Sequence, residues 1–255
     1  MTFSRLVRGL GRRVPRRPFR YVMPAWLVRG PYRFWLSVVA ADPDRRRAVR
    51  ELLELEAETR RQLDAAAIRY DDGVHAKHRL TAYHDFFVER VREGERVLDV
   101  GSGKGELAHD LAVRAGAVVV GIDYDPHHLA FARSRFAHGR VTYVAGDVLA
   151  AVPEGGFDVI VLSNVLEHIA DRVGLLTRLV VSARPRVVLL RVPVLARDWT
   201  VPLRREVGLE YFSDPDHEIE YDEQSFRAEL DEARLRVTEL QPVWGELWAA
   251  AEPAP

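Results

Sequence analysis

The stretch VLDVGSGKGEL, residues 97–107, decides the fold of this chain. It begins as a short apolar run, which is typical of a buried parallel strand, and continues into Gly101, Gly103 and Gly105. Glycines let the backbone turn tightly and come close to a ligand, and the helix that follows offers free N–H groups. In open α/β sheets ligands bind where strands end, so we expect a ligand at this turn.

The pattern around this stretch alternates short β-branched runs with helical segments. The apolar runs lie at 96–100, 117–122, 141–144, 159–162 and 186–192, and the helical segments lie near 104–115, 126–137 and 171–183. A further helix is expected at 222–233, and residues 235–240 and 243–249 suit a terminal hairpin. This alternation predicts an α/β fold with a doubly wound, mostly parallel sheet that is covered on both faces.

The chain of 255 residues is predicted to have three parts: a basic N-terminal extension (1–41), a helical segment (42–93) and the α/β domain (94–250), with an insertion at 193–221. Asp42 and Pro43 suit the start of a long helix. The Asp-Asp-Gly sequence at 71–73 ends it, and a second helix is expected from 75 to 92.

The basic extension carries nine arginines and no acidic residue, a net charge of +9, whereas the whole chain has −1. The remaining residues are therefore acidic, which makes nucleic acid a poor substrate. Prolines and arginines interrupt the extension too often for a membrane-spanning helix, and no secretory signal is recognisable. Three interpretations stay open: a disordered or loosely packed extension, an arm that holds the protein on an anionic membrane surface, and an organelle transit peptide, for which the segment has few serines.

The composition narrows the chemistry further. With no cysteine, the chain has no disulfide, thiolate metal site or cysteine nucleophile, and a cytoplasmic location is expected. With 47% apolar and 29% charged residues, the composition is that of a globular protein.

Acidic residues after the strands indicate the kind of ligand. Glu106 stands where a nicotinamide-dinucleotide fingerprint needs glycine, and Lys104 is followed by glycine, which excludes a P-loop. A nucleoside without phosphate is favoured instead. Asp123 ends the second strand 22 residues after Gly101, a spacing that suits hydrogen bonds with both ribose hydroxyls. Asp147 follows the third strand and could meet an adenine amino group or belong to an ordinary turn.

These motifs together resemble those of the class I S-adenosylmethionine-dependent methyltransferases. Residues 99–105 resemble their cofactor loop, Asp123 their ribose acid, 146–148 their adenine turn and 157–168 their fourth motif. The resemblance implies a seven-stranded Rossmann-like sheet with an antiparallel last strand, and S-adenosyl-L-methionine as the cofactor. The cofactor residues it implies are His78, Arg79, Tyr83, Asp99, Gly101, Ser102, Gly103, Gly105, Asp123, Tyr124, Asp147, Val148, Ser163 and Asn164.

The first three of these residues lie on the helix before the first strand, where cations would suit the cofactor's methionine carboxylate. A solvated helix face explains them equally well. Several shorter motifs resemble uncharacterised methyltransferases associated with bacterial glycan or secondary-metabolite pathways: residues 76–80, 83–87, 162–168, 191–193, 197–199 and 244–246. That resemblance makes O-methylation of a sugar hydroxyl the first expectation.

Methyl transfer needs no covalent intermediate, but a hydroxyl acceptor gains from a nearby base. His168, after the fourth strand, and His217, in the insertion, are the candidates for this catalytic role, and a structural role is an alternative for each. Aromatic and charged residues in and beside the insertion suit a carbohydrate or small molecule. The predicted substrate-binding residues are Arg191, Arg197, Trp199, Tyr211, Glu218 and Tyr221.

Glu167, His168, His217 and Glu218 could together supply ligands for a divalent metal. Their spacing is no recognised metal motif, so no metal site is predicted. Two other function classes compete with methyl transfer. One is a binding or scaffold protein that has lost catalysis, and the other is an NAD-dependent reductase, which Glu106 and the lack of a Tyr-x-x-x-Lys pair disfavour. The sequence leaves the oligomeric state open.

Overall fold

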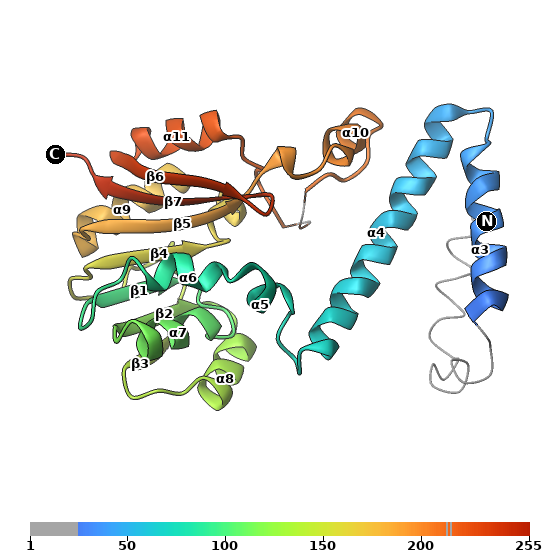
Figure 1. Ribbon diagram of the computed structural model, residues 1–255. Coiled ribbons are helices and arrows are strands. Elements are labelled where there is room, and N and C mark those ends of the chain that lie inside the picture. Colours follow the sequence, from blue (N-terminus) through green and yellow to red (C-terminus); the bar gives the residue numbers. More distant parts are fainter. Residues whose placement is uncertain (1–24, 213, 215) are drawn as a thin grey trace. The chain divides into compact units, whose positions relative to one another are not determined.

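The computed structural model describes residues 25–212, 214 and 216–255. The chain divides into two compact units, residues 1–62 and 63–255, with the boundary inside one long helix. The first unit contributes two described helices, and the second contains a seven-stranded sheet with helices on both faces (Figure 1).

The first unit contains α3 (Ala25–Ala40) and the beginning of α4 (Arg45–Tyr70). Residues 25–40 are therefore helical, which excludes a disordered extension for them, while most of their side chains are exposed. Seven of the nine arginines of the extension precede residue 25 and lie outside the described residues. Among the helices of the described residues, none combines the length and the apolar character that crossing a membrane requires.

The start of α4 differs from the prediction by two residues. Asp44, rather than Asp42, accepts the hydrogen bond from the backbone N–H of Arg47, at 3.1 Å, as a helix-capping side chain does. Asp42 instead accepts from the backbone N–H of Asp44, at 2.9 Å, and forms an ion pair with Arg47.

The second helix expected at 75–92 is split into α5 (Lys77–Thr81) and α6 (Tyr83–Val88). Ala82, between them, has a φ of 49°, a left-handed conformation that a helix does not contain. The prediction of one continuous helix is therefore wrong, because this residue turns the chain before it reaches the sheet.

The sheet of the second unit has the order β3-β2-β1-β4-β5-β7-β6. Its strands are β1 (Arg96–Val100), β2 (Val118–Asp123), β3 (Val141–Ala145), β4 (Val159–Ser163), β5 (Val187–Pro193), β6 (Leu235–Val243) and β7 (Glu246–Pro253). The first five strands are parallel, and β7 runs antiparallel to both β5 and β6. This confirms the predicted doubly wound sheet, its terminal hairpin and its antiparallel last strand.

Alternate residues of each strand face two separate apolar cores. Leu98 and Leu162 pack in the core that includes α9 and α11, whereas Val97 and Val161 pack in the core that includes α6, α7 and α8. The bounds of these helices are α7 (Glu106–Arg114), α8 (Pro126–Arg135), α9 (Arg172–Ala183) and α11 (Glu223–Glu232).

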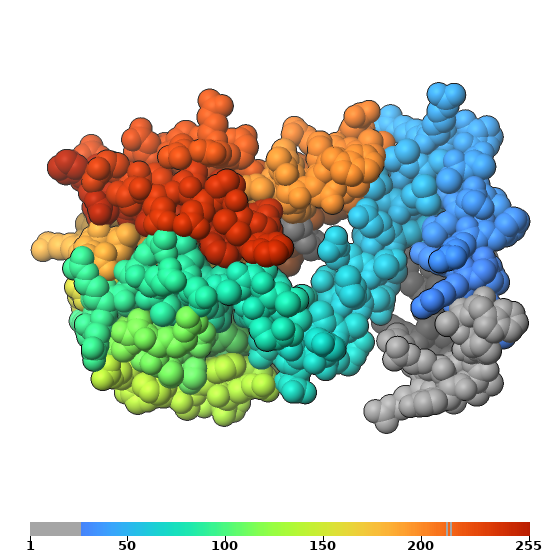
Figure 2. All heavy atoms as spheres, viewed as in Figure 1, coloured from blue at the N-terminus to red at the C-terminus, as the bar shows by residue number. Residues whose placement is uncertain are grey.

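The C-terminal hairpin and α6 lie side by side on the face shown in Figure 2. An ion pair of 2.6 Å joins Arg90, after α6, to Glu239 on β6, and the rings of Phe86 and Trp248 lie 5.9 Å apart. The segment before β1 is therefore held against the opposite end of the chain.

The strand order changes direction between β1 and β4, because the chain passes from the edge strand β3 back across β1 before it enters β4. Loops that leave two such strands in opposite directions open a crevice at their carboxyl ends, where α/β proteins bind ligands. The segment after β5, with η2 (Leu195–Arg197) and α10 (Thr200–Glu206), starts at the same end of the sheet.

Candidate functional site

The loop after β1 is joined to the end of β2 by Asp123. The backbone N–H of Gly103 donates to Asp123 Oδ2 and that of Asp125 to Oδ1, each at 2.8 Å. Gly103 has a φ of 53°, which allows its N–H to point at the carboxylate. Asp123 is 7% exposed, and a carboxylate can accept about four hydrogen bonds, so it keeps capacity for two hydroxyls.

Glycine is needed at the three positions of this loop for different structural reasons. A Cβ at Gly101 would lie 2.8 Å from Val165 in the loop after β4, so Gly101 lets the two loops approach each other. A Cβ at Gly105 would lie 2.8 Å from Cζ of Tyr143 on β3 and 2.9 Å from the Cβ of Ala132 on α8. Gly105 therefore allows close packing of this loop against β3 and α8, and its predicted contact with the cofactor stays a prediction.

Buried polar atoms without a partner gather at the ends of β1 and β4. In the described part of the chain, six buried side-chain polar atoms lack a hydrogen bond, and five of them lie at the ends of these two strands or directly after them: Asp99 Oδ2, Ser102 Oγ, Asn164 Oδ1 and both carboxylate oxygens of Glu167. The sixth is Nε2 of His84. Such groups are normally paired, because each unpaired one costs about 1–3 kcal/mol. Their concentration indicates a site shaped for a polar ligand.

Asp99 lies near the end of β1 and is buried, with 2% exposure. Burial, with repulsion from Asp123 and Glu106, raises the pKa of Asp99 to about 8. Its carboxyl group therefore keeps its proton at neutral pH and can donate a hydrogen bond.

The predicted adenine turn lies at the end of β3. Asp147 is exposed, and its Oδ1 accepts a hydrogen bond of 2.8 Å from the backbone N–H of Leu149, as an ordinary turn aspartate does. Val148 is partly buried and packs against the core, and Tyr124, after β2, is exposed. The roles of these three residues toward a cofactor stay predictions.

The residues of α5 and α6 that were expected to bind the cofactor differ in charge and in exposure. Burial and the neighbouring His84 lower the pKa of His78 to about 3, so His78 is neutral and its Nδ1 lies 3.1 Å from Tyr83 Oη. Arg79 is exposed and forms an ion pair of 3.0 Å with Asp71. His78, Arg79 and Glu106 line a cavity of about 360 Å³. The predicted contact of His78, Arg79 and Tyr83 with a cofactor carboxylate stays a prediction, in which Arg79 rather than His78 supplies the positive charge.

Arg191, predicted to bind substrate, is held in a buried ion pair. Its Nε and Nη2 donate to the carboxylate of Glu246 on β7 at 2.6 and 2.9 Å, and its Nη1 donates to Ser163 Oγ at 3.1 Å. Its guanidinium also lies 3.7 Å from the ring centre of Tyr83. With 3% exposure, Arg191 positions Ser163 and Tyr83 in this structure and does not reach solvent. Sequence reasoning missed Glu246, although it noted the motif at 244–246.

The other predicted substrate residues are dispersed. Trp199 is 75% exposed and Tyr211 is partly buried. Arg197 forms an ion pair with the buried Glu220 and donates to the backbone carbonyl of Tyr211 at 2.8 Å. Tyr221 is fully buried in the core with α9 and α11, and its hydroxyl bonds Glu229. The predicted contact of Tyr221 with substrate is therefore wrong for this structure, because the ring packs in the interior.

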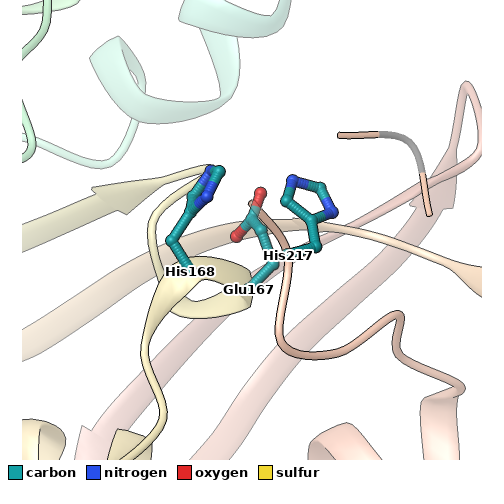
Figure 3. Close-up of side chains that lie close together, drawn as sticks. All are labelled: Glu167, His168 and His217. Carbon is teal, nitrogen blue, oxygen red and sulfur yellow. The ribbon is translucent and has the colours of Figure 1, made fainter. Parts of the chain in front are cut away.

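The two histidines that the sequence predicts to be catalytic, 49 residues apart in sequence, lie together with Glu167 (Figure 3). Glu167 and His168 belong to η1 (Leu166–His168), directly after β4. The rings of His168 and His217 have centroids 4.6 Å apart and are nearly perpendicular. A backbone hydrogen bond of 2.7 Å from Glu218 to the carbonyl of Glu167 holds the two segments side by side. We call Glu167, His168 and His217 the histidine–glutamate cluster.

The cluster is electrostatically unusual. Burial raises the pKa of Glu167 to about 7, although His217 and Arg191 act in the opposite direction. Burial and the neighbouring His217 lower the pKa of His168. At neutral pH the imidazole of His168 is therefore largely neutral and able to accept a proton. The side chain of Glu218, which sequence reasoning also considered, is exposed.

Comparison with known proteins matches residues 97–186 to the methyltransferase domain family. The ubiquinone biosynthesis O-methyltransferase of Schizosaccharomyces pombe is 32% identical over 137 residues, which are 48% of this chain and 50% of that protein. The chain spans half or less of the length of the curated relatives it matches.

Two solved structures share the fold of the second unit. An S-adenosylmethionine-dependent methyltransferase from Aquifex aeolicus is 18% identical, with a TM-score of 0.57 over 75% of this chain and 99% of that chain. The magnesium protoporphyrin IX methyltransferase of Synechocystis, solved with bound S-adenosylhomocysteine, is 19% identical, with a TM-score of 0.55 over 68% of this chain and 83% of that chain. Residues 97–186 thus match the methyltransferase domain family, within a sheet that has the fold of the class I S-adenosylmethionine-dependent methyltransferases.

Proposed function

We propose that this protein binds S-adenosylmethionine between the loops after β1 and β4 and catalyses transfer of its methyl group to a hydroxyl of a small molecule. The observation that carries this proposal is the concentration of unpartnered buried polar atoms at those two loops. The residues fit the cofactor: Asp123 suits the ribose hydroxyls, and the glycine loop allows close approach of a ligand. The match to an O-methyltransferase supports a hydroxyl as the acceptor.

Bound S-adenosylmethionine supplies an electrophilic methyl group, so the protein has to align the acceptor and remove its proton. The oxygen–carbon bond forms while the sulfur–carbon bond breaks, and the hydroxyl proton leaves for a base. The histidine–glutamate cluster follows β4 directly, beside the loop whose Asn164 carries an unpartnered oxygen. His217 is the proposed base, because it comes from the insertion and lies next to Glu167.

For the acceptor we propose a sugar hydroxyl as the first class to test. The exposed ring of Trp199 and the partly exposed ring of Tyr211 offer aromatic surfaces in the segment after β5, and Glu218 adds an exposed carboxylate. Aromatic platforms with polar groups around them suit carbohydrates.

We expect Asp123→Ala to weaken binding of S-adenosylmethionine by about 1–3 kcal/mol, about 5- to 150-fold, because the ribose hydroxyls lose their acceptor. Isothermal titration calorimetry measures this difference. Asp125→Ala is the matched control, since Asp125 caps α8 through the N–H of His127 and its side chain does not bond the glycine loop. Equal affinities of the wild type and Asp123→Ala would remove the ribose assignment.

We also propose that the basic extension binds an anionic membrane surface. On α3 the apolar side chains of Val28, Phe34 and Val38 are exposed by 53%, 71% and 52%, and Arg29 and Arg33 lie on the same helix. Because residues 1–41 contain no acidic residue, nothing in the extension opposes attraction to anionic lipid.

Deletion of residues 1–41 should leave affinity for S-adenosylmethionine unchanged, because the cofactor site belongs to the second unit. Vesicles with about 30% anionic lipid should sediment together with the full-length protein. The bound fraction should fall as salt is added, because a higher ionic strength screens the attraction between arginines and anionic lipid. Equal sedimentation of the full-length and truncated proteins would overturn the membrane proposal.

A further inference from the structure

We propose that Glu167, His168 and His217 bind one divalent metal ion of the first transition series. Binding of the ion is independent of the proposed function. The further idea that the bound ion lowers the pKa of the acceptor hydroxyl rests on that function. In that case His217 would bind the ion and would not take up the hydroxyl proton directly.

The burial of Glu167 is the first argument. This side chain is fully buried, and neither of its carboxylate oxygens has a hydrogen-bond partner. A buried carboxylate without a partner is costly, and such groups are normally paired or bound to a metal. Both oxygens belong to a side chain that lies between the two imidazoles in Figure 3. The site therefore presents an acidic ligand whose bonding capacity the protein itself does not use.

The geometry of the cluster is the second argument. One ligand atom from each of the three residues lies within 4.8 Å of the others. Ligands at about 2.0–2.2 Å from one ion lie roughly 3–4 Å apart, so a small contraction closes the site around an ion. His168 is exposed at the edge of the cluster and can make this adjustment by rotation of its side chain. Glu167 and His217 are buried, and the backbone bond from Glu218 holds their segments together.

The surroundings of His217 are the third argument. Its Nδ1 lies 3.3 Å from Oε1 of Glu220, which is itself buried and paired with Arg197. A carboxylate behind Nδ1 favours the tautomer that carries its proton there and leaves the lone pair on Nε2. Metal-binding histidines almost always have such a partner behind the ring. Glu220 thus supplies the second interaction that a metal site needs.

The ligand types indicate the class of ion. Two imidazoles and one carboxylate suit Mn²⁺, Fe²⁺, Co²⁺ or Zn²⁺, whereas Mg²⁺ and Ca²⁺ prefer ligand sets made of oxygen alone. Three protein ligands leave coordination positions for other groups, as in catalytic metal sites. Given the proposed function, an acceptor hydroxyl is the group that would take one of them.

Cobalt titration of the full-length protein, after removal of metals with a chelator, tests this inference without S-adenosylmethionine or acceptor. We expect Co²⁺ to bind with one-to-one stoichiometry and to produce visible absorption bands. Glu167→Gln keeps the shape of the side chain but removes its charge, and should weaken Co²⁺ binding at least 10-fold. Glu154→Gln, an exposed carboxylate on another loop, is the control and should bind Co²⁺ as the wild type does.

Thermal unfolding with and without Co²⁺ keeps the test independent of folding defects. Glu167→Gln should unfold at the wild-type temperature or above without metal, because it no longer buries an unpartnered charge. Only the wild type and Glu154→Gln should gain stability from Co²⁺. Equal Co²⁺ affinity in the wild type and Glu167→Gln, or no saturable binding by the wild type, would overturn the metal site. If the wild-type protein bound Co²⁺ but did not bind S-adenosylmethionine in a separate assay, the proposed function would be overturned and the metal site would stand.

Discussion

Arg191→Met is expected to lower the free energy of unfolding by about 3 kcal/mol, the largest stability effect that we expect from one substitution in this chain. The change leaves Glu246 without the guanidinium that donates to both of its oxygens, and it removes the group that stacks on Tyr83. Breaking a buried pair is costly because one charge stays behind in the interior. Urea denaturation followed by circular dichroism measures the loss.

The double variant Arg191→Met with Glu246→Gln is the control for this mechanism. It should recover part of the lost stability, because the remaining charge is gone while Trp248 can still donate to residue 246. A loss below about 1 kcal/mol in Arg191→Met would mean that the pair behaves like an exposed salt bridge. The assignment of Arg191 as a buried positioning residue would then fail.

His217→Ala is expected to lower turnover at least about 10²-fold while affinity for S-adenosylmethionine stays within about threefold. In the proposed mechanism His217 acts on the acceptor hydroxyl, either directly as the base or through a bound ion, and it is not part of the glycine loop. The measurement is the rate of transfer of a labelled methyl group, using an acceptor found by screening hydroxyl-bearing glycans and metabolites.

His138→Ala is the matched control, since this exposed histidine lies between α8 and β3 and belongs to neither loop of the site. Its turnover should equal that of the wild type. Near-normal turnover of His217→Ala from pH 6 to 9 would exclude His217 from the reaction. The same assay on His168→Ala would then show whether the other imidazole of the cluster carries the proton.

The sheet could be predicted from sequence because each buried strand is a short β-branched run with a loop at each end. The expected run at 117–122 became β2 at 118–123, a shift of one residue. Asp123 was also predictable, since its distance from the glycine loop follows from the length of one strand and one helix. The strands and the position of Asp123 depend on residues that are near one another in the chain, so the sequence pattern is sufficient to predict them.

Features that depend on distant contacts were not predictable. The left-handed Ala82 that splits α5 from α6 has no sequence signal, because alanine favours helix. Arg191 looked available to substrate until the antiparallel register placed it beside Glu246, 55 residues away. Tyr221 looked like an aromatic platform of the insertion, but the packing of α11 places it in the core.

The histidine–glutamate cluster combines a feature that the sequence predicts, the types of its residues, with one that it does not predict, their arrangement in space. The sequence suggested Glu167, His168, His217 and Glu218 as a set of ligand types, but only the fold shows which of them converge. The backbone bond at Glu218 directs His217 toward Glu167, and the side chain of Glu218 remains exposed. Glu220, which lies behind His217, could have been suspected only from its position three residues further along the chain.

Equilibrium dialysis of the full-length protein against labelled S-adenosylmethionine, with NADH in a parallel cell, tests most directly the claim that the crevice between β1 and β4 binds this cofactor. We predict saturable binding of one S-adenosylmethionine per chain, its displacement by S-adenosylhomocysteine, and no binding of NADH, since Glu106 occupies the position where a dinucleotide site needs glycine. Saturable binding of NADH, or absence of S-adenosylmethionine binding by the folded protein, would contradict the account.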